Sequence, residues 1–308
     1  MIKECFKLWN EREYKYPVKG NFIPNIVSYI HDEDENIRPA LIVVPGGGYT
    51  MVSSTEGEIV AKEFYNKGYN TFVITYTTNL LRDTPLKKQP LKDISKAIVL
   101  IRKNSNKFRI DPNRLAICGF SAGGHLVGSL AVHYKDKDLI LNDKYKDINN
   151  RPNAIILSYP VITSGEYAHK DSFICLLGET ATREELEYMS LEKHVTSDTP
   201  PVFLWQTATD ELVLVENSYL FAKSCKENGV YYEHHVFGHG KHGMSLANED
   251  WANNNFGDDY TLEQFYGNLK FLIDNKVELA PPFDVINKLE NTDNIIEQIR
   301  EGMKAFSQ

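Results

Sequence analysis

Gly119-Phe-Ser-Ala-Gly123 is the stretch of sequence that decides the fold. Residues 113–119 form the short apolar run of a buried strand, and residues 122–131 carry the small and apolar side chains of a helix that packs on a sheet. Ser121 therefore lies at a sharp strand-to-helix turn, where the backbone is strained and small neighbours are needed. A Gly-x-Ser-x-Gly pattern arises by chance in roughly one chain in ten of this length. The flanking strand and helix make chance a poor explanation, and we predict that Ser121 is a nucleophile on a nucleophile elbow.

Length and charge limit the class of protein. The 308 residues fit one α/β domain, which we place at residues 1–275, followed by a helical C-terminal extension at residues 276–308. The formal net charge is −8, and no basic run offsets it. Such a charge argues against nucleic acid as the main partner, so a neutral or small substrate is expected.

The N-terminus and the cysteines indicate the cellular compartment. Residues 1–12 lack the apolar core of a signal peptide, and no apolar stretch is long enough to cross a bilayer. Cys5, Cys118, Cys175 and Cys225 are far apart and form no Cys-x-x-Cys pair, which favours free, mostly buried thiols over disulfides or a metal site. These features predict a cytoplasmic protein without a membrane segment.

A glycine-rich loop is the second informative stretch. Ala40-Leu-Ile-Val-Val44 is an unbroken apolar run, typical of a parallel strand covered on both faces, and it ends in Pro45-Gly-Gly-Gly-Tyr49. Three glycines after a strand are explained equally well by a tight turn. Together with a nucleophile they predict an oxyanion hole, in which the N–H groups of Gly47 or Gly48 and of Ala122 stabilise the charge of a tetrahedral intermediate.

Strands and helices alternate along the rest of the chain, which predicts an α/β protein with a mostly parallel sheet and helices on both faces. The expected strands are 25–31 at a sheet edge, 69–76, 154–159, 201–207 and 230–237, and the expected helices are 56–67, 91–107, 215–228 and 260–275. Residues 1–24 show no clear periodicity, and residues 109–114 are expected to form a turn. Residues 160–200 are expected to cover the active-site edge as a lid, or else to form a plain surface insertion.

A serine nucleophile needs a base and a carboxylate that orients the base. Asp210 follows the strand 201–207 at its carboxyl end, which is the side where sites in parallel sheets lie. Asp198 precedes the same strand and lies at the wrong edge. Asp210 is the predicted acid, with the adjacent Glu211 in reserve.

The base is sought among nine histidines. His239 and His242 lie in the glycine-rich loop after the last strand, where the base of such a site is needed. His242 is preferred because Gly243-Met-Ser-Leu246, which follows it, can return to the core. The pair His234-His235 lies inside a strand, and His125 lies in the elbow helix, where packing or a local hydrogen bond is expected.

These motifs resemble those of the α/β-hydrolases, and among them the carbohydrate esterases of the acetyl xylan esterase and feruloyl or acetyl esterase type. The resemblance covers about residues 25–275 and is most specific in Pro45-Gly-Gly-Gly-Tyr49, Asp111-Pro112, Gly119-Phe-Ser-Ala-Gly-Gly-His-Leu126, Ser158-Tyr-Pro-Val161, Thr207-Ala-Thr-Asp210, Val215-Glu-Asn217 and His242-Gly243. In that family the triad falls at Ser121, Asp210 and His242, in agreement with the choice made from the residues.

Two departures from related families bear on the substrate. Related lipases begin the glycine loop with His, where this chain has Pro45, and this favours the carbohydrate esterase branch. Relatives often have His where Gln206 stands, which leaves the acyl group undecided.

The resemblance implies a serine esterase that removes O-acetyl groups from short xylo-oligosaccharides or similar sugars through an acyl-enzyme. No metal or other cofactor is expected, because the triad supplies both nucleophile and base. Sugar binding calls for exposed aromatic rings, for which Tyr49, Tyr167 and Phe173 are the candidates. An arylformamidase or small peptidase with the same triad stays open, and so does a ligand-binding protein that does no catalysis.

The C-terminal extension carries no candidate site. Residues 283–306 are expected to form a charged helix with Ile295, Ile299, Met303 and Phe306 on one stripe. Such a stripe is typical of a packing face, within the chain or between the subunits of a homo-oligomer.

Overall fold

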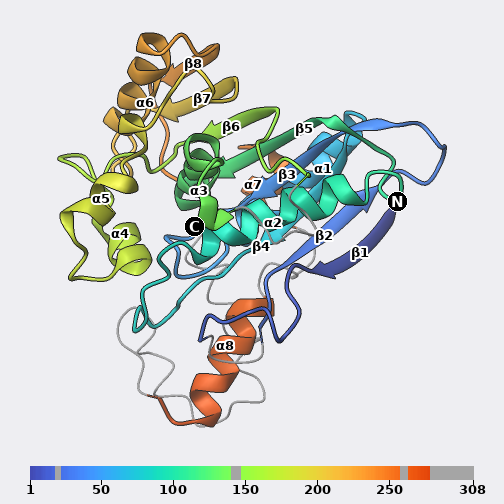
Figure 1. Cartoon of the computed structure of the whole chain (residues 1–308), viewed down its shortest axis with the longest axis horizontal. Coiled ribbons are helices and arrows are strands. Elements are labelled where there is room, and N and C mark those ends of the chain that lie inside the picture. Colours follow the sequence, from blue (N-terminus) through green and yellow to red (C-terminus); the bar gives the residue numbers. More distant parts are fainter. Residues whose placement is uncertain (18–21, 140–146, 257–262, 278–308) are drawn as a thin grey trace.

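An eight-stranded sheet forms the centre of the protein (Figure 1). The computed structural model describes residues 1–17, 22–139, 147–256 and 263–277. The strands are Ile2–Lys7 (β1), Asn25–Ile30 (β2), Arg38–Val44 (β3), Asn70–Thr75 (β4), Ile110–Phe120 (β5), Ala154–Ser158 (β6), Val202–Thr207 (β7) and Tyr232–Phe237 (β8). They lie in the order β1-β2-β4-β3-β5-β6-β7-β8. β2 runs antiparallel to both of its neighbours, and every pair from β4 to β8 is parallel, so the predicted mostly parallel sheet is confirmed.

Helices cover both faces of this sheet. The α-helices are Glu58–Asn66 (α1), Gln89–Lys103 (α2), Ser121–His133 (α3), Lys170–Leu177 (α4), Arg183–Tyr188 (α5), Glu216–Glu227 (α6), Glu249–Ala252 (α7) and Glu263–Asp274 (α8), and the short 3-10 helices are Ser54–Glu56 (η1), Lys137–Leu139 (η2) and Leu191–Lys193 (η3). Side chains of α2, α3 and α6 share one apolar core with one face of the sheet, whereas α1 and α7 pack on the other face. The predicted α/β-hydrolase architecture, with helices on both faces, is confirmed.

Strand β3 shows why its sequence is an unbroken apolar run. Ala40, Ile42 and Val44 belong to the core on the α2 and α3 side, whereas Leu41 and Val43 belong to the core on the α1 side. All five side chains are buried. A strand covered on both faces needs apolar side chains at every position, and this one ends directly at the glycine loop.

The N-terminal part of the sheet differs from the prediction in two ways. Residues Ile2–Lys7, for which no strand was predicted, form β1 and pair antiparallel with β2 from Ile2↔Ile30 to Lys7↔Asn25. β2 is therefore an inner strand between β1 and β4, and its assignment to the edge is wrong. β1 was missed because it is an edge strand of mostly exposed residues, with only a weak alternation of burial.

A third difference concerns the start of β5. Residues 110–114 lie within β5, so the predicted turn at 109–114 is wrong for most of its length. The pairing with β3 jumps from Arg38↔Ile110 to Ala40↔Leu115, which leaves the residues around Pro112 as an irregularity in the strand. Proline in a strand is typical of such irregular positions, because it has no N–H to donate.

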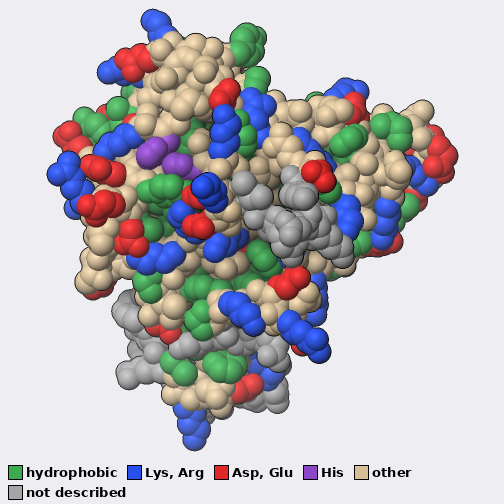
Figure 2. All heavy atoms as spheres, viewed as in Figure 1, with side chains coloured by type: hydrophobic (Ala, Val, Ile, Leu, Met, Phe, Trp, Pro, Cys, Tyr) green, Lys and Arg blue, Asp and Glu red, His purple; other side chains and the backbone are tan. Residues whose placement is uncertain are grey.

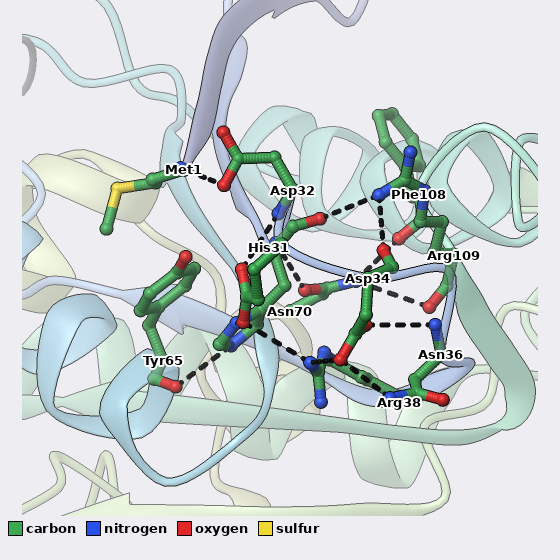
Figure 3. A network of polar contacts seen from close by, with 11 residues as sticks. Met1, His31, Asp32, Asp34, Asn36, Arg38, Tyr65, Asn70, Phe108 and Arg109 are labelled. Carbon is green, nitrogen blue, oxygen red and sulfur yellow. Dashed lines mark hydrogen bonds and ion pairs between the residues drawn. The ribbon is translucent and has the colours of Figure 1, made fainter.

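A polar network ties the N-terminus to the turn after β2 (Figure 3). The Met1 amine pairs with Asp32. The Asn70 side chain donates to the carbonyl of Phe108 at 2.8 Å and accepts the N–H of His31 at 3.0 Å. The network lies beside the amino ends of β3, β4 and β5 and closes that end of the sheet. The opposite, carboxyl ends are the place to look for a site.

Charges of both signs are interspersed over the face shown in Figure 2, without a large basic patch. This agrees with the small-substrate expectation drawn from the net charge. Over the described ranges, no helix combines the length and the apolar character that crossing a bilayer would require.

The cysteines behave as predicted. Cys118, Cys175 and Cys225 carry free, buried thiols, and Cys5 is exposed. Burial raises the pKa of Cys118 to about 12, so this thiol stays protonated and unreactive at neutral pH.

The C-terminal region is described only in part. α8 lies within the predicted helix 260–275, and its residues Phe265, Leu269 and Leu272 pack against Leu80 in a small separate core. The predicted helical tail at 283–306 and its apolar stripe lie outside the described residues. The proposed boundary between residues 275 and 276 stays a prediction.

Candidate active site

Ser121 stands at the carboxyl end of β5, on the turn into α3. Its φ is 51°, in the left-handed region that costs a non-glycine residue about 1–3 kcal/mol. A Cβ on Gly119 would lie 2.4 Å from the carbonyl oxygen of Gly123, and one on Gly123 would lie 2.2 Å from that of Val44. No side chain fits at either position, so the turn that holds Ser121 requires glycine on both sides of the serine.

The three residues chosen from the sequence lie together and form a chain of hydrogen bonds. Ser121 Oγ is 2.8 Å from His242 Nε2, and His242 Nδ1 is 2.7 Å from Asp210 Oδ2. Asp210 Oδ1 accepts the N–H groups of Leu212 at 3.0 Å and Val213 at 2.9 Å. Because the Asp210 carboxylate accepts the proton on Nδ1, Nε2 is left to accept the hydroxyl proton of Ser121.

The three side chains come from the carboxyl ends of three parallel strands. Ser121 follows β5, Asp210 lies in the loop after β7, and His242 lies in the loop after β8. The Asp210 carboxylate is fully buried, whereas the His242 side chain is 14% exposed and Ser121 is 8% exposed. The acid is thus shielded from water, while the serine and the base remain reachable from outside.

The candidates that were set aside lie elsewhere. Glu211 and His239 are exposed, and Asp198 pairs with Lys135 on the surface. His125 is fully buried, and burial lowers its pKa to about 4, so it is neutral at neutral pH. Its Nε2 donates to the Met189 carbonyl at 2.9 Å, which makes it a packing residue, as predicted.

The glycine loop after β3 lies beside the elbow. Gly47 and Gly48 both have left-handed backbones, with φ of 118° and 62°. The atoms nearest to a Cβ on Gly48 would be hydroxyl oxygens at 4.0 Å, so the space around this backbone is open. Ala122 is the second residue of α3, so its N–H is one of the four that have no partner within the helix. The candidate oxyanion donors are therefore present on two sides of the elbow.

Tyr49 and Phe173 do not present exposed rings, and this expectation is wrong for both. Tyr49 is 1% exposed, and its hydroxyl donates to His125 Nδ1 at 2.7 Å. Its φ of 63° turns the side chain into the core, where the ring lies edge-on to Tyr76. Phe173 is 5% exposed. Tyr167 is half-buried and remains the aromatic candidate of the three.

The excursion at residues 160–200 packs over the glycine loop through α4. Ser172 Oγ is 4.0 Å from the position that a Cβ on Gly48 would occupy, and it lies 2.8 Å from His169 Nδ1. Burial is the main cause that lowers the pKa of His169, and the nearby His242 acts in the same direction. His169 and Ser172 were missed in the sequence because nothing in residues 160–200 shows which side chains reach the elbow.

Two buried amides, also missed, hold the loops around Asp210. Gln206 donates from Nε2 to the carbonyl of Val213, at the end of the Asp210 loop. Asn217 accepts the N–H of Ile162 at 2.9 Å and donates to the carbonyl of Tyr167 at 2.9 Å. Gln206 thus supports the acid loop, and Asn217 links α6 to the excursion.

A buried carboxylate lies directly behind the elbow. Glu56 Oε2 accepts the N–H of Gly46 at 2.7 Å, and Oε1 accepts the hydroxyl of Tyr159 at 2.8 Å. Sequence alone could not find it, because Tyr159 is 103 residues away along the chain. Across the described ranges, no three His, Cys, Asp or Glu side chains gather in an arrangement that could hold a metal ion.

Comparisons with known proteins place this geometry in a family. The BD-FAE family model matches residues 28–225. The chain is 51% identical to endo-1,4-beta-xylanase B of Butyrivibrio fibrisolvens over 258 residues, which is 83% of this chain and 40% of that protein. It is 30% identical to an acetylxylan esterase of Xylanibacter ruminicola over 214 residues, which is 68% of this chain and 41% of that protein. The chain thus spans about two fifths of the length of these two relatives.

A solved structure is similar over almost its whole length. The crystal structure of an acetyl ester-xyloside bifunctional hydrolase from Caldicellulosiruptor lactoaceticus aligns with a TM-score of 0.74 and 36% sequence identity. The alignment covers 87% of this chain and 97% of that chain.

Proposed function

Because the chain belongs to the BD-FAE family of α/β-hydrolase carbohydrate esterases, we propose that it is a serine esterase that removes acetyl groups from small acetylated carbohydrates such as xylo-oligosaccharides. The observation that carries this proposal is the unbroken chain of hydrogen bonds from Ser121 through His242 to Asp210. A serine hydroxyl is a weak nucleophile, and this chain supplies the base and the fixed tautomer that activate it.

In the first step Ser121 Oγ attacks the acetyl carbon while its proton passes to His242 Nε2. The 2.8 Å separation of these two atoms lies within the range for direct proton transfer. The imidazolium that forms donates from Nδ1 to the Asp210 carboxylate, which is itself held by two backbone N–H groups. Asp210 thereby stabilises the charged base without moving.

Negative charge develops on the former carbonyl oxygen as the serine attacks. We assign its stabilisation to the N–H of Ala122 together with that of Gly47 or Gly48. The N-terminus of α3 supports this assignment, because aligned peptide dipoles favour a negative charge there. Removing one such donor in a comparable site slows the reaction by about a hundredfold to a thousandfold.

The tetrahedral intermediate then collapses. The bond between the acetyl carbon and the sugar oxygen breaks, and His242 returns the proton to that oxygen, so that the deacetylated sugar leaves and Ser121 carries the acetyl group. A water molecule then attacks the acetyl carbon while His242 takes its proton. The bond between the acetyl carbon and Ser121 Oγ breaks, His242 returns the proton to Oγ, and acetate is released. His242 acts in turn as base and acid in both halves.

The proposal transfers the ester chemistry of the relatives and leaves their glycosidic chemistry aside. Hydrolysis of a glycosidic bond generally needs two carboxyl groups that flank the bond. Asp210 and Glu56 supply the carboxyl groups beside Ser121. Both are buried and hydrogen-bonded within the protein. Neither can flank a sugar, whereas Ser121 and His242 can meet an ester.

Sugar contacts are assigned to the excursion and the Asp210 loop. Tyr167 and His169 are half-buried in the excursion, and His169 contacts Ser172 beside the glycine loop. His169 is an uncharged hydrogen-bonding group at neutral pH because burial lowers its pKa. Leu212 and Leu214, in the loop that holds Asp210, are 54% and 42% exposed. An apolar rim with a few hydrogen-bonding groups suits a sugar ring, which has both apolar faces and hydroxyls.

A substrate screen of the purified protein tests this function. We expect acetate release from acetylated xylo-oligosaccharides at rates above those for feruloylated sugars, long-chain esters and formyl amides, with or without EDTA. The Ser121→Ala protein is the control for background hydrolysis. Preference for long-chain esters, or loss of activity with EDTA, would contradict the proposal. Faster turnover of formyl amides or peptides would indicate an arylformamidase or peptidase with the same triad.

A further inference from the structure

Glu56 is a buried ionisable group for which the triad mechanism has no role. It is the last residue of η1, which follows the glycine loop in the chain, and it is 3% exposed. A Cβ on Gly46 would lie 2.9 Å from Glu56 Oε2 and 2.8 Å from Ser121 Cβ, so the carboxylate is close behind the nucleophile. Burying a carboxylate costs free energy unless its oxygens are hydrogen-bonded, and here each oxygen has a donor.

The hydrogen bonds around Glu56 join it to two other loops. Oε2 accepts the N–H of Gly46, and Oε1 accepts the hydroxyl of Tyr159. The Tyr159 oxygen in turn accepts the N–H of Ser245 at 3.0 Å. Both carboxyl oxygens are therefore used as acceptors, and burial raises the pKa of Glu56 above its ordinary value.

The two hydrogen-bond partners of Glu56 lead to the two loops that serve the nucleophile. Gly46 precedes Gly47 and Gly48, the candidate oxyanion donors. Ser245 follows His242 in the same loop, and the Tyr159 ring packs edge-on to the imidazole with centroids 4.9 Å apart. Tyr159 and Ser245 both have left-handed backbones, with φ of 38° and 49°. Such strain is kept only where the surrounding structure holds it, and it clusters at functional sites.

We propose that Glu56 is a positioning residue that fixes the glycine loop through Gly46 and the His242 loop through Tyr159. The inference rests on the proposed roles of Ser121 and His242. Glu56 touches neither substrate nor the reacting atoms, so it acts through its two partners.

The test is the rate of Ser121 labelling by a fluorophosphonate at pH 8, which needs no knowledge of the natural substrate. In Glu56→Gln this rate should fall about tenfold. The reason is that the amide has one acceptor oxygen and must turn its N–H₂ group toward either the N–H of Gly46 or the hydroxyl of Tyr159. Glu56→Asp, which keeps two acceptor oxygens, should recover most of the wild-type rate.

Glu58→Gln is the matched control, since Glu58 is also buried but pairs with Lys3 and Lys62. It should label at the wild-type rate. If Glu56→Gln does not fold, Tyr159→Phe cuts the link to Ser245 while keeping the carboxyl group, and it should slow labelling. Wild-type labelling of folded Glu56→Gln or of Tyr159→Phe, or an equal loss of rate in Glu56→Asp, would overturn the inference. Folded wild-type protein that is not labelled at all would instead overturn the proposed function.

Discussion

Ser121→Ala is expected to lower kcat for p-nitrophenyl acetate by about four orders of magnitude or more, since a triad without its nucleophile keeps only binding and oxyanion stabilisation. The variant should remain folded. Ser121 holds a φ of 51°, and alanine has the same Cβ, so the backbone strain of the elbow is unchanged. Within the part of the chain that the structure describes, the hydroxyl is hydrogen-bonded to His242, which keeps its hydrogen bond to Asp210 in the variant.

The measurement is steady-state turnover, with circular dichroism and thermal unfolding as controls for the fold. Ser121→Cys is a useful companion, because it keeps a nucleophile of similar shape at the same position. Turnover near the wild-type rate in folded Ser121→Ala would exclude the covalent mechanism, whatever the substrate.

His242→Ala and Asp210→Asn should each lower kcat strongly, by about a million-fold and ten-thousand-fold respectively in a comparable triad. Asn at position 210 can still accept the N–H groups of Leu212 and Val213 through its oxygen. Its amide N–H₂ would then face His242 Nδ1, which would have to accept. The proton would move to Nε2, and the imidazole could no longer take the proton of Ser121.

Because the three residues act as one unit, the effects should not add. The double variant Asp210→Asn/His242→Ala should be about as active as His242→Ala alone. His239→Ala and Glu211→Gln are the matched controls, since both residues are exposed and lie in the same two loops. Additive losses, or inactivation by His239→Ala with an active His242→Ala, would show that the base is assigned to the wrong residue.

Much of the fold could be predicted because the deciding signals are local. The apolar run 40–44 ends in a glycine loop, and glycine is required near Ser121 because a Cβ on Gly123 would lie 2.2 Å from the Val44 carbonyl oxygen. Ser121, Asp210 and His242 could then be grouped, because each follows a parallel strand and the carboxyl ends of parallel strands meet at one edge of the sheet. β1 was not predicted, because an edge strand buries few side chains and because its pairing with β2 joins residues that are distant in the sequence.

The supporting residues of the site could not be predicted, because their contacts join distant parts of the chain. Tyr49 follows the glycine loop, but only its backbone angle and the position of His125 decide that the ring points into the core. Glu56 meets Tyr159 across 103 residues, and although Tyr159 lies in the Ser158–Val161 motif, the local sequence does not show that the two side chains meet. Local motifs thus locate the proposed reacting groups, whereas their supports require the three-dimensional structure.

The most direct test of the central claim is detection of the acetyl-enzyme. An activated ester such as p-nitrophenyl acetate is expected to acylate the serine faster than water removes the acetyl group, so the intermediate should accumulate and give a burst of p-nitrophenol. The reaction is quenched in acid, and the digested protein is mapped by mass spectrometry. The account predicts an acetyl group on Ser121, absent from Ser121→Ala. Acetate release with an acetyl group on another residue, or a burst without modified Ser121, would contradict it.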